Sequence, residues 1–329
     1  MREYTPTSVA QHGAALARTT PEVERVREGV WVIPLPLPER GGVESTLCYS
    51  IADAEGGVHL IDPGWDTDAN LARLEAGLAI AGFGLDDVRG VTATHLHPDH
   101  LGLGQSLRAR GIPVGMHRRE HVSLTRALYP EAEATMERWG VPESWLSQVV
   151  DALVPRSAPS GYGADLELDD GDLLDIPGRR LRVVATPGHT AGSICLHDED
   201  EQLFFSGDHV LPIINPGLGL GGFDPDDDPI GAALDSYAAV AAYDEAEVCP
   251  GHGYRFYGLA VRAGQIADRH RRRSAEVGAI AAANPGATVW QIAEQVSWTD
   301  GWENLVPFMR LSALAQTELH LKHLARTPT

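Results

Sequence analysis

The chain has 329 residues, of which 43% are hydrophobic and 22% charged, a balance that is typical of globular proteins and argues against fibrous or intrinsically disordered chains. Its 26 basic and 46 acidic residues leave a net charge of −20, which argues against binding to nucleic-acid phosphates. No apolar run approaches the roughly 18 residues that a membrane helix requires, so no membrane partner is expected. This length predicts two domains, or one large α/β unit with an appendage.

The first 24 residues lack the continuous apolar stretch of a secretory signal, so we expect a flexible N-terminus at 1–24 and a cytoplasmic protein. The three cysteines, Cys48, Cys195 and Cys249, lie far apart and are odd in number. They form neither a disulfide framework nor a CxxC metal knuckle, which indicates a reducing compartment.

The first half of the chain alternates between strand and helix patterns. Residues 29–61 contain short β-type runs separated by glycine-rich turns, which predicts an antiparallel sheet. Residues 66–81 have helical leucine spacing, and residues 88–94 return to strand character. A helix is expected from about residue 99 to 107, followed by a short strand at 112–115.

Residues 117–160 have helical spacing and predict an inserted segment, which either packs over a sheet edge or walls a substrate cleft. Strand-like runs return between residues 166 and 253, with one helix around 234–243. From 259 to 329 the pattern is helical, with Thr288 as a predicted N-cap, and it predicts a small winged-helix-like appendage. This appendage either packs on the main domain or forms a homodimer through apolar positions: Trp290, Trp298, Trp302 and Leu311.

The strongest chemical signal is the segment Thr94-His95-Leu96-His97-Pro98-Asp99-His100. His95 and His97 are two residues apart in an extended segment, so their side chains project to the same side. Asp99 and His100 open the following helix. Because these four groups and more distant ligands cannot easily all reach one tetrahedral ion, the pattern indicates two adjacent metals.

Three later strand ends each place a polar side chain beside glycine: His189 in TPGHT, Asp208 in SGDH and His252 in PGHG. Glycine permits the close backbone approach that a crowded site requires. Each segment alone is weak, but together with the first one they predict a common metal site. We interpret His209 as a neighbour that packs beside this site.

The order THLHPDH, TPGHT, SGDH and PGHG, preceded by LIDPG at residues 60–64, resembles the metallo-β-lactamase superfamily over about residues 25–258. The resemblance implies an α/β (α+β) fold, a four-layer αββα sandwich with two metals at one rim of its sheets. It implies that Asp62 orients a ligand or nearby backbone, although an aspartate before proline is also typical of a turn or N-cap. The implied ligands are His95, His97 and His189 for the first metal, Asp99, His100 and His252 for the second, and Asp208 as the bridge.

The residue types narrow the branch and the metal. Asp208 at the bridging position resembles the hydrolase branches, such as glyoxalase II, ribonuclease Z and lactonases, more than true β-lactamases, so β-lactam hydrolysis is a minor alternative. His97 stands where the diiron flavoprotein branch favours a carboxylate. The imidazole-rich set therefore favours two Zn²⁺ per chain, with iron or manganese as alternatives.

The resemblance implies a metal-dependent hydrolase in which a metal-bound hydroxide attacks an ester, thioester or lactone of a small molecule. Asp99 is the candidate that shuttles the proton. Tyr254 and Arg255 follow the last ligand and are candidate substrate-binding residues, because a guanidinium pairs readily with a carboxylate or phosphate.

Two other functions remain as hypotheses. A metal-dependent RNA or phosphodiester hydrolase is suggested by the helical appendage, which resembles one found in an RNA-cleaving branch, and by the basic run at residues 269–273. The charge of −20 argues against it, and such a run is more typical of a solvated helix face. The third hypothesis is a non-hydrolytic protein, either a metal redox enzyme or a scaffold in which metals only hold loops together.

Overall fold

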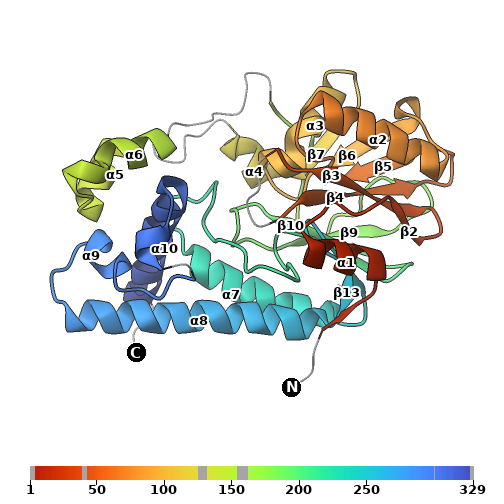
Figure 1. The fold of residues 1–329 in the computed structure, drawn as a ribbon. Coiled ribbons are helices and arrows are strands. Elements are labelled where there is room, and N and C mark those ends of the chain that lie inside the picture. The colour runs from red at the N-terminus through yellow and green to blue at the C-terminus, as the bar shows by residue number, and fades with distance from the viewer. Residues whose placement is uncertain (1–3, 39–42, 125–131, 154–161, 300, 327–329) are drawn as a thin grey trace.

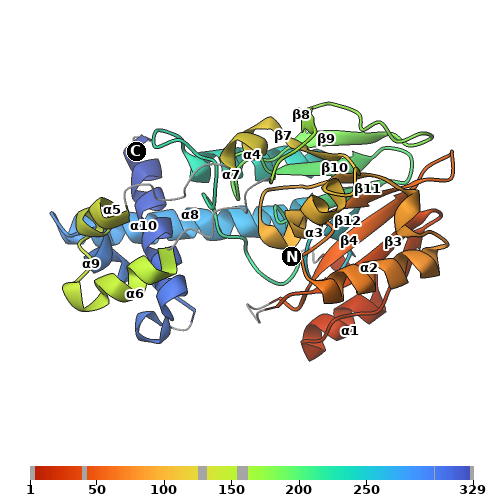
Figure 2. The ribbon, with the colours of Figure 1, turned by 90° about the horizontal axis from the view of Figure 1, so that it is seen from above.

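Two β-sheets stack face to face and helices cover both outer faces, which gives four layers (Figure 1). The computed structural model describes residues 4–38, 43–124, 132–153, 162–299 and 301–326. Seen from above, the sheets and their covering helices occupy one side of the molecule, and a group of helices occupies the other (Figure 2). The mixed α/β sandwich that the sequence predicts is therefore confirmed.

Seven strands form the first sheet, and their spatial order is the order in which they occur along the chain. They are β2 (Glu24–Arg27), β3 (Val30–Pro36), β4 (Ser45–Ala52), β5 (Val58–Ile61), β6 (Val88–Thr92), β7 (Val114–His117) and β8 (Leu166–Leu168). Neighbours from β2 to β5 are antiparallel, as the glycine-rich turns predict, whereas neighbours from β5 to β8 are parallel.

Six strands form the second sheet. They are, in spatial order, β1 (Thr5–Pro6), β13 (Phe256–Tyr257), β12 (Glu247–Pro250), β11 (Leu203–Gly207), β10 (Ile194–Asp198) and β9 (Leu181–Ala185). β11 and β12 are parallel, and β10 is antiparallel to both β9 and β11. The strands β9, β11 and β12 therefore point in one direction, and their carboxyl ends lie at one edge of the sheet.

The described residues contain helices of very different length, and none of them is long and apolar enough to cross a membrane. The α-helices are α1 (Val9–Ala17), α2 (Asp68–Ala81), α3 (Pro98–Arg108), α4 (Arg118–Ser123), α5 (Ala132–Trp139), α6 (Glu143–Leu153), α7 (Pro229–Ala239), α8 (Leu259–Ala283), α9 (Val289–Ala293) and α10 (Pro307–Arg326). Short 3-10 turns are η1 (Leu85–Asp87), η2 (Val240–Tyr243) and η3 (Trp302–Asn304).

Local side-chain chemistry sets where several helices begin. The Thr67 hydroxyl accepts a hydrogen bond from the Asn70 amide at the start of α2. The Thr288 hydroxyl accepts from the Gln291 amide, and the Gln291 side chain accepts from the Thr288 amide in return. This reciprocal capping box confirms the predicted N-cap of α9.

Three apolar cores separate the four layers. One lies between the first sheet and helices α2 and α3, one between the two sheets, and one between the second sheet and helices α7 and α8. Successive side chains of a strand point to opposite faces, so Phe205 enters the central core and Phe204 the outer core. The three cysteines are buried, one in each core.

The described part of the N-terminal segment makes several contacts with the rest of the fold. Strand β1 pairs with β13, and the buried Gln11 side chain of α1 accepts a hydrogen bond from the Arg255 amide at 3.0 Å. The Tyr4 hydroxyl also donates to the Pro212 carbonyl at 2.7 Å. Strand β1 therefore covers an edge of the second sheet, and the flexibility expected of residues 1–24 stays a prediction.

The predicted domain boundary between residues 258 and 259 falls at the first residue of α8. Leu259, Ala263 and Ile266 of α8 lie in the outer core of the second sheet, together with residues of α7. A helix of 25 residues spans about 37 Å, so α8 runs from the sheet to the far group of helices, as Figure 1 shows. The main domain and the C-terminal helices therefore share one long helix.

Helices α5, α6, α9 and α10 form what we call the helical cluster. Its apolar core joins the predicted insertion to the C-terminal helices. Of the insertion, α4 packs against β7 and β8 at the sheet edge, while α6 packs against α10. The residues predicted to drive dimerisation are instead buried or half-buried within this chain: Trp290, Trp298, Trp302 and Leu311.

The described C-terminal residues form helices, and part of the basic run packs within them. Described residues 259–299 and 301–326 contain no strand, so the winged-helix-like arrangement is not confirmed. Within the basic run at 269–273, His270 is buried, and Arg273 pairs with Glu276 and lies over the Trp298 ring at 4.6 Å. Part of the basic run is therefore structural.

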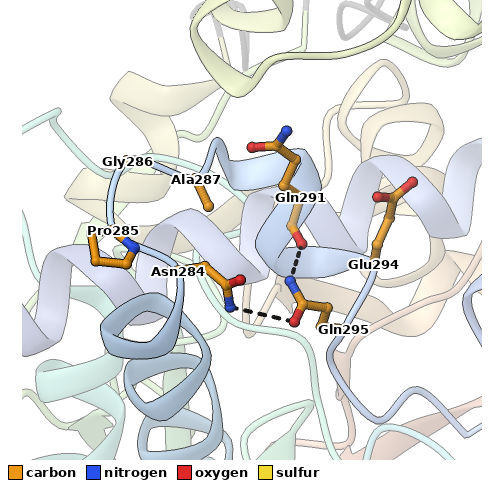
Figure 3. A pocket seen from close by; sticks show the side chains of 7 residues that line it. All are labelled: Asn284, Pro285, Gly286, Ala287, Gln291, Glu294 and Gln295. Carbon is orange, nitrogen blue, oxygen red and sulfur yellow. Dashed lines mark hydrogen bonds between the residues drawn. The ribbon is translucent and has the colours of Figure 1, made fainter.

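A shallow hollow of about 480 Å³ lies at the turn between α8 and α9 (Figure 3). It is lined mainly by polar groups and includes none of the predicted metal ligands. Inside it the side-chain Nε2 of Gln295 donates to the backbone carbonyl of Gln291 at 2.9 Å. The lining residues are Asn284, Pro285, Gly286, Ala287, Gln291, Glu294 and Gln295.

Candidate metal centre

The predicted ligands meet at one rim of the sandwich because each follows the carboxyl end of a strand. His95 follows β6, His189 follows β9, Asp208 follows β11 and His252 follows β12. Their side-chain atoms form three overlapping groups whose members lie within 4.8 Å of one another. The structure thus brings together all seven predicted ligands: His95, His97, Asp99, His100, His189, Asp208 and His252.

Two sets of three ligands stand out, and we call them the first triad (His95, His97, His189) and the second triad (Asp99, His100, His252). In the first triad, His97 Nδ1 lies 2.9 Å from His95 Nε2 and 3.1 Å from His189 Nε2. In the second triad, His100 Nε2 lies 3.2 Å from His252 Nε2, which lies 3.3 Å from Asp99 Oδ2. Each triad therefore points its ligand atoms at a common centre.

The opposite ring nitrogens of the first triad have hydrogen-bond acceptors. His189 Nδ1 lies 2.7 Å from the Gly217 carbonyl, and His97 Nε2 lies 3.1 Å from the Leu220 carbonyl. A carbonyl only accepts, so we assign the proton of each neutral ring to that nitrogen. His97 Nδ1 and His189 Nε2 then carry no proton, and their lone pairs face each other.

The second triad is oriented in the same way. His100 Nδ1 donates to Asp62 Oδ2 at 2.8 Å, and His252 Nδ1 donates to the Ser45 carbonyl at 2.9 Å. When both rings are neutral, the two Nε2 atoms carry no proton, and their lone pairs face each other. Acceptors behind a ligand histidine are the usual means of fixing its tautomer and orientation.

Asp208 lies between the two triads. Its Oδ1 is 3.4 Å from both His100 Nε2 and His252 Nε2, and its Oδ2 is 3.8 Å from His189 Nε2. The two oxygens of one carboxylate thus face different triads. This is the placement expected of a bridging ligand.

The donor chemistry of this site fits a pair of zinc ions. Facing lone pairs repel unless a cation lies between them, and four nitrogen or oxygen donors at about 2.0–2.1 Å from a tetrahedral zinc are about 3.3 Å apart. Eight donor separations within the triads and to Asp208 are 2.9–3.8 Å and bracket that value, and the ligand atoms of each triad lie within 4.8 Å of one another. The residues present therefore suit two cations held by imidazole and carboxylate groups.

The electrostatics of the two triads differ. Burial lowers the pKa of His95 and His97, and it lowers the pKa of His189 to about 4, which keeps these rings in the neutral form that binds a metal. Burial opposes charge on His100 and His252 as well. There Asp208 and the neighbouring carboxylates outweigh burial and raise the pKa of both rings. A positive charge is thus favoured at the second triad.

The carboxylates respond in the complementary direction. Burial alone would raise the pKa of Asp99, but the nearby His100 and His252 outweigh it and lower the pKa below its ordinary value. Burial would also raise the pKa of Asp208, but the nearby His252 and His100 outweigh burial and lower it. Both carboxylates are therefore ionised and available as ligands.

Asp62 holds the two halves of the histidine segment. Its Oδ2 accepts from His100 Nδ1 and from the Thr94 hydroxyl at 2.8 Å, and its Oδ1 accepts from the Thr94 amide at 2.7 Å. The Thr94 hydroxyl lies 3.1 Å from His95 Nδ1 and can accept a hydrogen bond from it. Asp62 has φ of +52°, a left-handed conformation in which aspartate is enriched.

Glycine beside the ligands serves the close approach that the sequence suggests. A Cβ atom at Gly251 would lie 2.7 Å from His100 Cε1 and 2.8 Å from Asp208 Oδ1. Contacts this short do not occur between real side chains, so a larger residue would displace both ligands. The glycine that precedes His252 is therefore required by the crowding of the site.

Glu120 of α4 is a buried residue at this site that the sequence analysis misses. Its two carboxylate oxygens accept from the Leu96 and Gly192 amides, each at 2.7 Å. These amides belong to the loops that carry the first triad. Burial raises the pKa of Glu120 to about 7. A lone glutamate in a helical pattern gives no signal of such a role.

The two predicted substrate-binding residues are placed elsewhere. Arg255 is 4% exposed, and its guanidinium pairs with Glu247 at 2.5 Å and Glu24 at 2.8 Å. Glu247 begins β12, so this ion pair lies at the end of the strand opposite to His252. Tyr254 is buried in the outer core of the second sheet. Ion pairing and burial engage both side chains within the fold, and their role in substrate binding stays a prediction.

His209 agrees with its interpretation as a packing residue. It is buried, and its ring stacks on Tyr237 with centroids 4.5 Å apart. Burial lowers its pKa to about 3. His209 belongs to none of the groups of ligand atoms found among the described residues.

Comparison with known proteins agrees with the fold and the ligand pattern. The model of the metallo-beta-lactamase superfamily matches residues 41–252, which contain both triads and Asp208. The chain therefore belongs to the metallo-β-lactamase superfamily.

Within this superfamily the chain is similar to several known proteins. Over 129 residues it is 36% identical to the human acyl-coenzyme A thioesterase MBLAC2, a match that covers 36% of this chain and 40% of the relative. It is 25% identical over 163 residues to the Haemophilus influenzae hydroxyacylglutathione hydrolase GloC, covering 49% of this chain and 65% of that protein. The chain thus spans less than two thirds of the length of these curated relatives.

A solved structure extends the likeness to nearly the whole chain. The metallo-beta-lactamase family protein TTHA1429 from Thermus thermophilus superposes with a TM-score of 0.73 at 29% identity. The alignment covers 92% of this chain and 94% of that one. Since the superfamily model ends at residue 252, the similarity in fold continues into the C-terminal helices.

Proposed function

We propose that this chain is a dinuclear metal-dependent hydrolase that cleaves the thioester bond of a small molecule, with esters and lactones as related carbonyl substrates. The observation that carries the proposal is the pair of triads with facing lone pairs and Asp208 between them. Each triad with one oxygen of Asp208 supplies four donors, the number that a tetrahedral zinc takes from its ligands.

In this proposal the first triad holds one ion, the second triad holds the other, and Asp208 contacts both. When bound, two such ions lower the pKa of a coordinated water, which becomes the nucleophile, and polarise the substrate carbonyl. The Gly217, Leu220 and Ser45 carbonyls orient the rings, and Asp62 orients His100 and, through Thr94, His95. No serine or cysteine nucleophile is required.

Asp99 is the proposed proton carrier. Its side chain is 20% exposed, against 13% for Asp208, so it is the carboxylate better placed to exchange protons with solvent. Its lowered pKa keeps the carboxylate ionised and free to accept a hydrogen bond, but it also makes Asp99 a weak base, so the proposal rests on the position of Asp99 and not on its pKa. In the overall reaction the water oxygen forms the new bond to the carbonyl carbon, the carbon–sulfur bond breaks, and the leaving thiolate takes the proton that the water loses.

The relatives support the choice of a thioester. Two of them are named for cleaving thioesters of coenzyme A and of glutathione. Asp208 at the expected bridging position, a feature that resembles the hydrolase branches, also favours this group over true β-lactamases. Two Zn²⁺ per chain is the proposed loading, with iron or manganese as the alternatives.

The experiment that tests the proposal is metal analysis followed by an activity panel on the same preparation. We expect two zinc ions per chain, hydrolysis of acyl-coenzyme A or acylglutathione thioesters, and loss of activity after chelation with recovery on adding zinc. The panel includes lactones, a phosphodiester and a β-lactam. A preparation that binds no metal, or that hydrolyses the phosphodiester and no thioester, would contradict the proposal.

A further inference from the structure

We propose that Gln316 of α10 is a positioning residue for the first triad, although it lies far from every ligand in the sequence. It acts through the backbone segment 217–220, which we call the bracing segment. The inference rests on the proposed metal centre. It assigns the helical cluster a part in building one of the two metal subsites.

The Gln316 side chain binds one residue of the bracing segment with both ends of its amide. Its Nε2 donates to the Leu218 carbonyl at 2.5 Å, and its Oε1 accepts from the Leu218 amide at 3.4 Å. Leu218 itself is fully buried against the outer core of the second sheet. The backbone of this loop residue is thus held by a side chain from α10.

The residues on either side of Leu218 orient two ligands of the first triad. The Gly217 carbonyl accepts from His189 Nδ1 at 2.7 Å, and the Leu220 carbonyl accepts from His97 Nε2 at 3.1 Å. These two carbonyls determine which nitrogen of each ring is free to bind a cation. A shift of the bracing segment would therefore move both acceptors together.

Helix α10 also packs directly on this segment. Gly219 has φ of +68°, and a Cβ atom there would lie 2.6 Å from Leu319 Cδ1, one turn of α10 beyond Gln316. At the far end of the same loop, His323 Nδ1 lies 2.8 Å from Asp228 Oδ2. The contact with Gln316 is therefore part of a continuous interface between α10 and the loop.

Other bonds limit the size of the expected effect. The Gly219 amide donates to the Gly188 carbonyl and the Leu220 amide to the His189 carbonyl, each at 2.8 Å. These bonds hold the bracing segment to the loop of His189 when Gln316 is changed. Loss of the Gln316 contact should therefore loosen the two acceptors without unfolding the loop.

The experiment uses the full chain with Gln316→Glu, Gln316→Ala and a control, Gln295→Glu, at an exposed position just after α9. The Gln316→Glu variant keeps the size of the side chain but cannot donate to the Leu218 carbonyl. We expect one of the two zinc dissociation constants to rise about 10-fold in both Gln316 variants and the other to stay unchanged, as for groups that orient a ligand. Competition with a chromophoric chelator measures both constants.

A second readout locates the effect. In zinc-loaded protein with ¹⁵N-labelled histidine, the ring signals of His97 and His189 should shift in the Gln316→Glu variant, while those of His100 and His252 stay in place. The inference is overturned if both constants and all ring signals match the wild type, or if both constants rise equally. A wild type that binds no zinc would instead overturn the proposed function, and the inference with it.

Discussion

The two triads differ in which part of the molecule supports them. The second triad is oriented by Asp62, which follows β5, and by the Ser45 carbonyl at the start of β4. Both belong to neighbouring strands of the first sheet. In the first triad, His97 and His189 are oriented by carbonyls of the loop that follows Asp208, and that loop is held by α10.

This difference indicates that the sandwich alone suffices for one subsite and not for the other. The second triad depends on elements that the central and first-sheet cores hold rigid. The first triad also depends on contacts with helices that a simple domain division would separate from the catalytic unit. Substitutions that act on one set of supports should therefore change one metal affinity more than the other.

The largest effect is expected for the residue that both triads share. Asp208→Asn removes one charged oxygen from between the triads, so we expect both zinc affinities to fall by more than the roughly 100-fold limit typical of orienting residues. Thioester hydrolysis should fall with them. Chelator competition and activity assays measure both effects, with exposed Asp226→Asn as the control. Full retention of both zinc ions would contradict the shared role.

Asp62→Asn tests the support of the second triad. An amide nitrogen in place of Oδ2 or Oδ1 would face a donor, so His100 or Thr94 loses its acceptor. We expect one zinc constant to rise about 10–100-fold. The other should rise less, because Asp62 reaches His95 only through Thr94. An equal rise of both zinc dissociation constants would contradict the idea that the two triads have different supports.

Glu120→Gln tests the loops of the first triad from the side of α4. The variant keeps one acceptor oxygen, but its amide group faces a backbone N–H, which costs about 1–3 kcal/mol of stability. We expect a weaker first-triad zinc affinity and an unchanged second one. The matched control is Glu133→Gln, at an exposed position of α5, the next helix along the chain. An effect confined to the second triad would contradict the assignment.

The same residue predicts a pH dependence in the metal-free protein. Burial raises the folded pKa of Glu120 from 4.5 to about 7, so between these values the folded state binds more protons than the unfolded state. This group therefore makes the free energy of unfolding fall as pH rises through that window. Urea titrations at pH 5 and pH 7 measure the free energy of unfolding. Its decrease between the two pH values should be smaller in Glu120→Gln than in the wild type. An equal loss in both proteins would contradict the raised pKa.

The smallest effect on the metals is expected for Arg310, at the centre of the helical cluster. Its guanidinium is buried among the rings of Trp145, Trp290 and Trp302, at 3.6, 5.8 and 4.8 Å from their centroids. We expect Arg310→Met to lower the stability by about 2 kcal/mol through lost cation–π contacts. Thermal unfolding measures this loss, with exposed Arg272→Met as the control.

This variant also sharpens the comparison between the triads. Any change in zinc affinity should appear at the first triad, because α10 connects Arg310 with Gln316 and the second triad has no such contact in the described residues. If only the zinc affinity of the second triad changed, the inference that the helical cluster supports the first triad would be wrong.

Local sequence was sufficient to predict most of the elements and to name the seven candidate ligands that the structure brings together. The spacing of His95, His97, Asp99 and His100 along a strand end and a helix start is a short-range pattern, and the structure keeps these four side chains together. His189, Asp208 and His252 could be predicted because each stands beside glycine after a strand. The motif order, which resembles that of a known family, then indicates that the three residues share one site.

Long-range contacts could not be predicted in this way. Arg255 follows the last ligand closely, yet its guanidinium lies with Glu24 and Glu247 at the other end of β12. Glu120 and Gln316 look like ordinary polar residues of helices. Nothing in the spacing of a helix tells which distant loop it will meet.

The sequence by itself therefore determined the strand and helix pattern, the ligand types and the family, because these depend on residues that are neighbours along the chain or on a shared motif order. Only the tertiary structure decided that the insertion and the C-terminal helices form one cluster and that α10 braces the first triad. The physical reason is that these contacts join surfaces far apart in sequence, and their energy exists only once both surfaces are folded.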